Sequence, residues 1–179
     1  MKTIFPFLIL LSLVVDPLKI DFGADKGGQD WRVVNDGVMG GLSEGKANFT
    51  ESSILFKGTV SLDNNGGFSS LRSDFSNKKI SKYSQVKIRY RSTGISLAMT
   101  LSVSQRWYVP NYKVSLSGTK GVWKTVTFNL NDFRKHYIGK PMDEMLEEDT
   151  LKNIIRFGFI TDQKKYGDFE FEIDYLEFL

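Results

Sequence analysis

The chain has 179 residues, a length that suits one domain with a core large enough to stabilise itself. It contains no cysteine, which excludes disulfide bonds, thiolate catalysis and cysteine-ligated zinc or iron–sulfur centres. Its 24 Lys and Arg exceed its 21 Asp and Glu by 24 − 21 = 3, an excess too small to indicate nucleic-acid binding.

Residues 1–17 differ from the rest of the chain. Lys2 precedes an apolar run from Ile4 to Val15, which is typical of a secretory signal and too short to cross a bilayer as a helix. The small-x-small cleavage pattern is missing, so an uncleaved apolar arm or membrane tether is the alternative. We therefore expect an exported, periplasmic protein, or otherwise a cytoplasmic or membrane-associated one whose membrane contact depends on this segment alone. Residues 18–179 are expected to form the single domain.

Two glycine-rich segments follow, Trp31–Gly45 and Asn65–Arg72. Glycine tolerates positive φ and lets a second backbone or a ligand come close, so these segments are expected to be sharply shaped. The plain alternative is a pair of hairpin turns. What favours a more specific role is that Asn35, Asp36 and Arg72 are polar residues set between apolar ones.

The order of residues in these segments is specific. It comprises Trp31, Asn35-Asp36-Gly37-Val38-Met39-Gly40-Gly41, Ser43, Phe56, Gly58 and Gly66-Gly67-Phe68-x-Ser70-x-Arg72. This order resembles the complex I intermediate-associated protein family, from about Asp30 to the C-terminus. The later part of the resemblance rests on Trp123, Asn131-Asp132-Phe133, Gly139 and Ile155-x-Phe157-Gly158. The resemblance implies a galactose-binding-like β-sandwich and a role in assembling respiratory complex I in mitochondria.

From Leu18 onward the chain reads as short strands separated by turns. In Phe169–Tyr175, apolar and acidic residues alternate with a period of two, and the phase slips at Tyr175-Leu176, which indicates a bulge or the strand end. Other expected strands are Ser53–Ser61, Phe68–Phe75, Val86–Arg91, Ile95–Ser102, Tyr108–Ser115, Val122–Leu130 and Asn153–Thr161. Only Met142–Glu148 has the composition of a helix. The sequence predicts an all-β protein, an antiparallel β-sandwich of jelly-roll type with at most one short helix.

Two of these strands have strongly charged polar faces. One face carries Lys87, Arg89 and Arg91, and the other carries Glu170, Glu172 and Asp174. We expect both rows in the same sheet, lining one concave surface, where each opposite-charge pair contributes about 0.2–1 kcal/mol and fixes strand register. The alternative is two separate solvated faces.

The sequence offers little for catalysis. His136 is the only histidine and lies in a basic segment, no serine stands in a nucleophile elbow, and the glycine-rich segments match no phosphate-binding loop. Paired carboxylates remain available for hydrolysis of glycosides, but no local pair stands out. We therefore predict a protein that is not an enzyme and has no cofactor or metal site. No spacing matches a defined calcium loop, and the sequence leaves open whether a structural calcium is present.

Two kinds of binding site remain. The first is a surface for a protein partner, with respiratory-complex subunits implied by the resemblance, and it consists of Asn35, Asp36, Met39, Phe68 and Arg72. In the alternative interpretation the same segments only close one end of the sandwich, where Trp31, Met39 and Phe68 plug the core. There Asp36 and Arg72 would form a partly buried ion pair.

The second is a carbohydrate site on the segment Gln105–Tyr112. It would combine aromatic plates with hydrogen-bonding groups, as sugar sites generally do. The candidate residues are Trp107, Tyr108 and Tyr112, with Arg106, Asn111, Arg89 and Arg91 as polar partners. Alternatively, strand alternation buries Tyr108 or its neighbours, and Pro110 marks only an edge strand.

Overall fold

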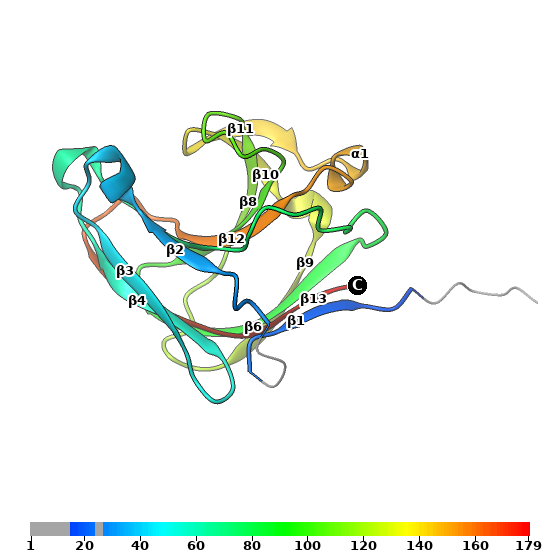
Figure 1. The fold of residues 1–179 in the computed structure, drawn as a ribbon, viewed down its shortest axis with the longest axis horizontal. Helices are drawn as coiled ribbons and strands as arrows, with labels where there is room; N and C mark the ends of the chain where they lie inside the picture. Colours follow the sequence, from blue (N-terminus) through cyan, green and yellow to red (C-terminus); the bar gives the residue numbers. More distant parts are fainter. Residues whose placement is uncertain (1–14, 24–26) are drawn as a thin grey trace, which may run out of the picture.

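The structure, a computed structural model, describes residues 15–23 and 27–179. Most of the expected signal-like segment lies outside the described residues. Two antiparallel sheets face each other as two layers (Figure 1). The prediction of an antiparallel β-sandwich is confirmed.

Six strands form the first sheet. In spatial order these are β3 (Glu44–Phe49), β4 (Ile54–Val60), β13 (Gly167–Phe178), β6 (Gln85–Gly94) and β9 (Lys124–Asn129), with β1 (Leu18–Asp21) also paired to β13. The strand β13 therefore pairs with three other strands of this sheet. Its first part pairs with β4, its last part with β1, and β6 lies along its other edge.

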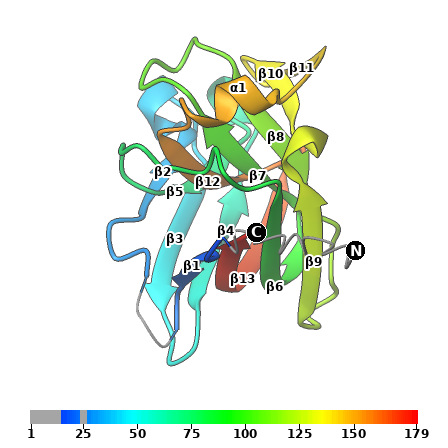
Figure 2. The same cartoon turned by 90° about the vertical axis from the view of Figure 1, so that its right-hand side faces the viewer.

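Seven strands form the second sheet. In spatial order these are β11 (Lys140–Met145), β10 (Arg134–Tyr137), β8 (Asn111–Ser115), β7 (Leu97–Ser102), β12 (Arg156–Thr161), β5 (Ser69–Arg72) and β2 (Arg32–Asn35). Figure 2 shows this layer, turned by 90°, with β2, β5, β12, β7 and β8 side by side. Both outer faces of the sandwich are thus built from regular strands, which hold side chains in fixed positions.

The core lies between the two sheets and is rich in aromatic rings. Phe171 of the six-stranded sheet lies 5.1 Å from Phe159 of the seven-stranded sheet, and Phe178 stacks on Phe157 at 4.8 Å between ring centroids. All four are buried, and aromatic pairs of this kind stabilise by about 0.5–1.5 kcal/mol beyond their buried area. The register of β13 shifts between Ile173 and Tyr175, so the bulge expected there is confirmed.

Several local expectations were wrong or incomplete. The strands β1, β2, β3, β10 and β11 were not among those predicted individually. The expected helix at Met142–Glu148 is mostly strand, because β11 pairs with β10 and tertiary pairing overrides helix propensity. The one α-helix, α1 (Glu148–Leu151), begins where that segment ends, and three 3-10 turns complete the described part: η1 (Asp36–Met39), η2 (Asp63–Asn65) and η3 (Leu130–Asp132). No helix within the described residues has the length and apolar character needed to cross a membrane.

Candidate functional site

The two glycine-rich segments meet at one end of the sandwich, where the Asp36 carboxylate joins them. Ser43 donates to it twice, from Oγ at 2.5 Å and from its backbone N–H at 2.9 Å. The N–H groups of Gly67 and Phe68 donate at 2.6 and 3.1 Å. A Cβ on Gly66 would lie 2.7 Å from the same carboxylate, so the glycine is required there. The prediction of sharply shaped, closely approaching segments is confirmed.

Asp36 is only 1% exposed. Burial raises the pKa of its carboxyl, but the hydrogen bonds from Ser43, Gly67 and Phe68 together outweigh burial and hold the pKa below its ordinary value of 3.8. The carboxylate is therefore a structural anion that is satisfied by neutral donors.

The expected ion pair between Asp36 and Arg72 is wrong. The hydrogen bonds just described occupy Asp36, while Arg72 directs its Nε to the Ser70 hydroxyl at 2.8 Å and lies 6.0 Å from the centre of the Phe68 ring. Arg72 is on the outward side of β5, because Leu71 between Ser70 and Arg72 is fully buried. The two glycine-rich segments are pinned by backbone donors instead of a guanidinium.

The other residues expected in the partner surface or in the core plug have separate roles. Asn35 accepts a hydrogen bond from Ser69 Oγ at 2.6 Å and donates to the Gly45 carbonyl, so it works inside the fold. Trp31 is buried against Phe159, as a core plug should be. Met39 is 66% exposed, so it does not plug the core.

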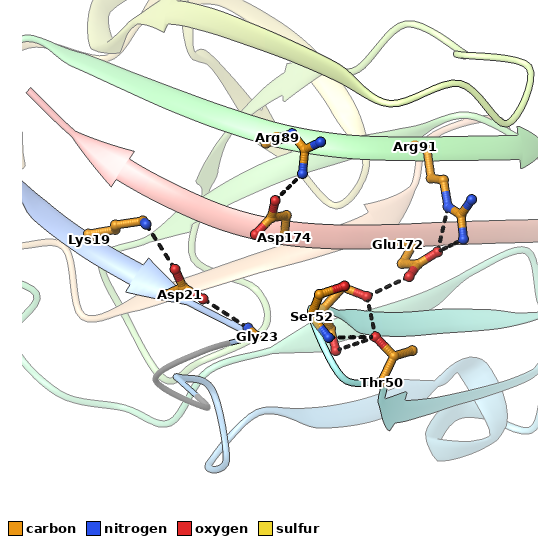
Figure 3. A network of polar contacts seen from close by, with 10 residues as sticks. Lys19, Asp21, Gly23, Thr50, Ser52, Arg89, Arg91, Glu172 and Asp174 are labelled. Carbon is orange, nitrogen blue, oxygen red and sulfur yellow. Dashed lines mark hydrogen bonds and ion pairs between the residues drawn. The ribbon is translucent and has the colours of Figure 1, made fainter.

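The outer face of the six-stranded sheet carries the two charged rows, and Figure 3 shows the Arg89–Asp174 and Arg91–Glu172 pairs among them. Arg91 pairs with Glu172 at 2.5 Å, Arg89 pairs with Asp174, and Lys87 pairs with Glu177 at 2.7 Å. The two rows lie on the adjacent strands β6 and β13, so the expectation of a single sheet is confirmed, with Glu177 in place of Glu170 as the third acid. These cations already have partners within the sheet.

The predicted carbohydrate groove does not assemble as expected. Arg89 and Arg91 belong to the six-stranded sheet, and Tyr112 is a core residue of β8 opposite Leu101. Trp107 and Tyr108 are 71% and 47% exposed, in the loop before β8. The aromatic loop therefore faces the solvent, but without the partners that the sequence analysis assigned on β6.

A different set of polar groups meets Trp107 on the outer face of the seven-stranded sheet. A cavity of about 140 Å³ is bounded there by β5, β7, β12 and the loop that precedes β8, roughly ten times the volume that one water needs. It is lined by Ser70, Arg72, Thr100, Ser102, Ser104, Gln105, Arg106, Trp107, Val109, Pro110, Asn111, Arg156 and Ile160. We call it the arginine cavity, after Arg72, Arg106 and Arg156.

Strand alternation explains why these side chains converge. Leu71, Leu101 and Phe157 point into the core, so their neighbours Arg72, Ser102 and Arg156 point outward. The pairings then set the outward residues side by side, with Arg156 opposite Ser102 and Ser102 opposite Asn111. The floor of the cavity is rigid because it is made of paired strands.

Two arginines of the cavity are held without an acid. Burial, together with the positive charge of Arg156, lowers the pKa of Arg72 to about 10. The Cζ of Arg156 lies over the Phe75 ring, 3.2 Å from its centroid, and the Nε of Arg156 is buried with no hydrogen-bond partner among the described residues. Both groups remain cationic at neutral pH and lie close enough to repel each other.

Sequence reasoning missed Arg156, Thr100 and Ser102. A usable signal existed for Arg156, which alternates with Phe157 and Phe159 and so had to face away from the core. What the sequence did not reveal was the register that sets β12 between β5 and β7.

No constellation for catalysis or metal binding is apparent in the described part of the chain. The Nδ1 of His136 donates to the Arg134 carbonyl of its own strand at 2.9 Å, and burial lowers the pKa of this imidazole. Across residues 15–23 and 27–179, no three His, Asp or Glu side chains are grouped as metal ligands would be.

A model of the complex I intermediate-associated protein 30 (CIA30) family matches residues 20–173. The chain belongs to the CIA30 family. The resemblance read from the glycine-rich segments is confirmed, and the match covers nearly all of the described sandwich. A comparison with curated protein sequences returned no match.

Among solved structures, this CIA30 chain is similar to the family 11 carbohydrate-binding module of the cellulosomal cellulase Lic26A-Cel5E of Clostridium thermocellum. That likeness has a TM-score of 0.67 and 18% sequence identity, and covers 93% of this chain and 95% of that one. A structure of the family 11 module from Clostridium thermocellum with a β-1,3-1,4-mixed-linked tetrasaccharide is also similar, with a TM-score of 0.64, 18% identity, and 90% and 95% coverage. At this identity the likeness establishes a shared β-sandwich fold.

Proposed function

We propose that this CIA30 chain is a non-catalytic binding module that holds a carbohydrate in the arginine cavity. The observation that carries the proposal is the meeting of an exposed indole, Trp107, with outward hydroxyls and guanidinium groups on a rigid sheet. An aromatic face packs on the apolar face of a sugar ring, while fixed donors and acceptors bind its hydroxyl groups.

The arrangement suits binding and not turnover. Thr100 and Ser102 supply hydroxyls, Asn111 supplies an amide, and no Asp or Glu lines the described cavity to act as an acid or base. Hydrolysis of a glycoside generally needs two carboxyl groups flanking the bond. The similar module that holds a mixed-linked tetrasaccharide makes mixed-linked glucan a sensible first probe.

The test is calorimetric titration of the full chain with soluble oligosaccharides, beginning with a mixed-linked tetrasaccharide. Trp107→Ala should weaken binding about tenfold or more, since stacking and burial at a hot spot commonly contribute more than 1 kcal/mol. Tyr166→Ala is the matched control, because Tyr166 is 73% exposed and does not line the cavity. Absence of heat with every neutral and acidic sugar would remove the proposal.

A second candidate function rests on an exposed apolar surface around η1. Val38, Met39 and Leu42 are 74%, 66% and 57% exposed around η1, and an exposed apolar cluster with a methionine suits an adaptable protein contact. We propose this tip as the contact with a protein partner, and membership of the family makes respiratory complex I subunits the first partners to examine.

Capture experiments distinguish this second function. The chain would be immobilised and exposed to membrane and periplasmic extracts, and a Val38→Ser/Met39→Ser variant would be compared with the control Tyr166→Ser. Selective loss of respiratory subunits with the tip variant supports the assembly role. Equal recovery with both variants contradicts it, and the fraction that yields the partner also reports the compartment.

A further inference from the structure

The arginine cavity has an excess of positive charge that its own sheet does not balance. Arg72, Arg106 and Arg156 line it, and none of them forms an ion pair within the described residues. None of the lining residues is Asp or Glu. A ligand in the cavity therefore meets several guanidinium groups and no protein carboxylate.

Two other cations of this face have acidic partners, whereas Arg32 of β2, opposite Arg72 in register, forms no ion pair within the described residues. Lys113 lies on β8 opposite Thr100 and holds Asp162 at 2.6 Å. Arg134 is next to Lys113 in register and holds Asp143 at 3.2 Å. The acidic partners Asp162 and Asp143 contact residues of β8 and β10, and neither acid lines the cavity.

The nearest acidic influence on the cavity comes from Asp74. Its charge raises the pKa of Arg156, while burial lowers it more strongly. However, its carboxylate is engaged by Lys78, whose Nζ lies 2.8 Å from Asp74 Oδ1. The buried Nε of Arg156 consequently keeps no acceptor, and a buried donor without a partner costs about 1–3 kcal/mol.

The two inner guanidinium groups are also positioned in advance. The Ser70 hydroxyl accepts a hydrogen bond from Arg72 Nε, and the Phe75 ring lies against the Arg156 guanidinium group. A planar guanidinium supplies parallel donors that match a carboxylate or a sulfate, and holding it in place reduces the entropy lost on binding. Trp107 at the same cavity offers an apolar plate to the ring that carries the anion.

We propose that the arginine cavity selects acidic carbohydrates, with the carboxylate of a uronic acid or the sulfate ester of a sulfated sugar placed between Arg72 and Arg156. This inference rests on the proposed function and adds the class of ligand. The anion accepts hydrogen bonds from the two guanidinium groups and relieves the repulsion between them.

The experiment compares ligands that differ only in charge. The full chain would be titrated calorimetrically with an oligogalacturonate and with the methyl ester of the same oligomer, and then with a carrageenan oligosaccharide and the same oligosaccharide after removal of its sulfate esters. The acid is expected to bind at least tenfold more tightly than its neutral counterpart. The preference should shrink when NaCl is raised from about 50 to about 300 mM, since added salt screens charge. Preference within the first or the second pair identifies the carboxylate or the sulfate as the anion.

Variants locate the binding. Arg156→Gln and Arg72→Gln should each weaken acid binding about tenfold or more, as expected for loss of a charge-assisted hydrogen bond. Arg89→Gln removes the same charge from the six-stranded sheet and should leave binding unchanged. Thermal melting of each variant checks that it is folded.

The outcomes separate the two proposals. Equal affinity for acidic and neutral sugars, or acid binding that survives both cavity variants, overturns the charge selectivity. If a neutral sugar binds and Trp107→Ala abolishes that binding, the carbohydrate function stands without this inference. Failure of every sugar in all four arms, and of the mixed-linked tetrasaccharide as well, overturns the proposed function and this inference together.

Discussion

On the six-stranded sheet Arg89 and Arg91 each meet a carboxylate of β13, whereas on the seven-stranded sheet Arg72 and Arg156 meet none. The first pair lies on an open face, partly exposed to water. The second pair lines a cavity and loses part of its hydration. The arginines that need a counter-charge more are the ones that lack it.

This difference helps to distinguish charges that stabilise the fold from charges that are available to bind a ligand. A charge that is buried or half-buried usually has a partner, because the loss of hydration is otherwise uncompensated. Asp36 follows that rule through hydrogen bonds from Ser43, Gly67 and Phe68. Arg156 departs from it, and perturbed, unbalanced groups of this kind cluster at functional sites.

Asp36→Ala is expected to cause the largest loss of stability, because it removes a buried charge whose hydrogen bonds are satisfied. It removes the acceptor of three N–H groups, one buried and two part-buried, and of the Ser43 hydroxyl, so we expect a loss of about 3 kcal/mol or more in the free energy of unfolding. The melting temperature should fall by about 6–12 °C. Asp143→Ala, at a fully exposed side chain, is the control. A fall as small as that of the control would contradict the role of Asp36.

Glu172→Ala tests the paired face. Glu172 is 6% exposed and accepts hydrogen bonds from Ser53 and Arg91, so its removal should cost about 1–3 kcal/mol in urea unfolding. The exposed Glu170 on the same strand makes no ion pair within the described chain, and Glu170→Ala should change stability by less than about 0.5 kcal/mol. Similar losses for both variants would show that the row is not a network.

The pH dependence of stability tests the role of the Asp36 carboxylate in the protein without a substitution. Because the pKa of Asp36 is lower in the folded state, its contribution is fully present above the ordinary value of 3.8. It is lost as the pH falls through the lower, folded-state pKa. Acid unfolding followed by circular dichroism should show this loss below about pH 4. Asp36→Asn should remove that part of the dependence, and identical acid profiles would contradict the assignment.

Arg156→Met is expected to have the smallest effect. The methionine keeps an apolar contact with Phe75 and removes a charge without a partner, so the free energy of unfolding should stay within about 0.5 kcal/mol of the parent. A loss above about 1.5 kcal/mol in urea unfolding would mean that Arg156 holds the fold, and the contrast between the two faces would then fail.

Much of the fold followed from the sequence because it depends on local alternation. The strand around Phe171 and the slip after Ile173 were readable from a period of two. Segments with weak alternation, such as β2 and β11, were missed, since their strand character comes from pairing with neighbours. The helix expected at Met142 failed for the same reason.

The candidate site was harder to predict because it depends on register between distant strands. Trp107, Arg106 and Asn111 are near one another in sequence and were identified together. Arg72 lies on β5 and Arg156 lies on β12. These two strands pair in antiparallel orientation, but no local sequence pattern relates the two residues. The Asp36–Arg72 ion pair was inferred from residue type alone, and backbone donors, which have no signature in sequence, took the place of the guanidinium.

The placement of β13 has a consequence for how the molecule is made. This strand joins β4, β6 and β1 in one sheet, yet it is the last strand of the sandwich to leave the ribosome. Until Gly167–Phe178 has been synthesised, β4 and β6 lack their common neighbour and keep open edges. The layer therefore closes only after translation of the domain, through contacts between distant residues that form slowly.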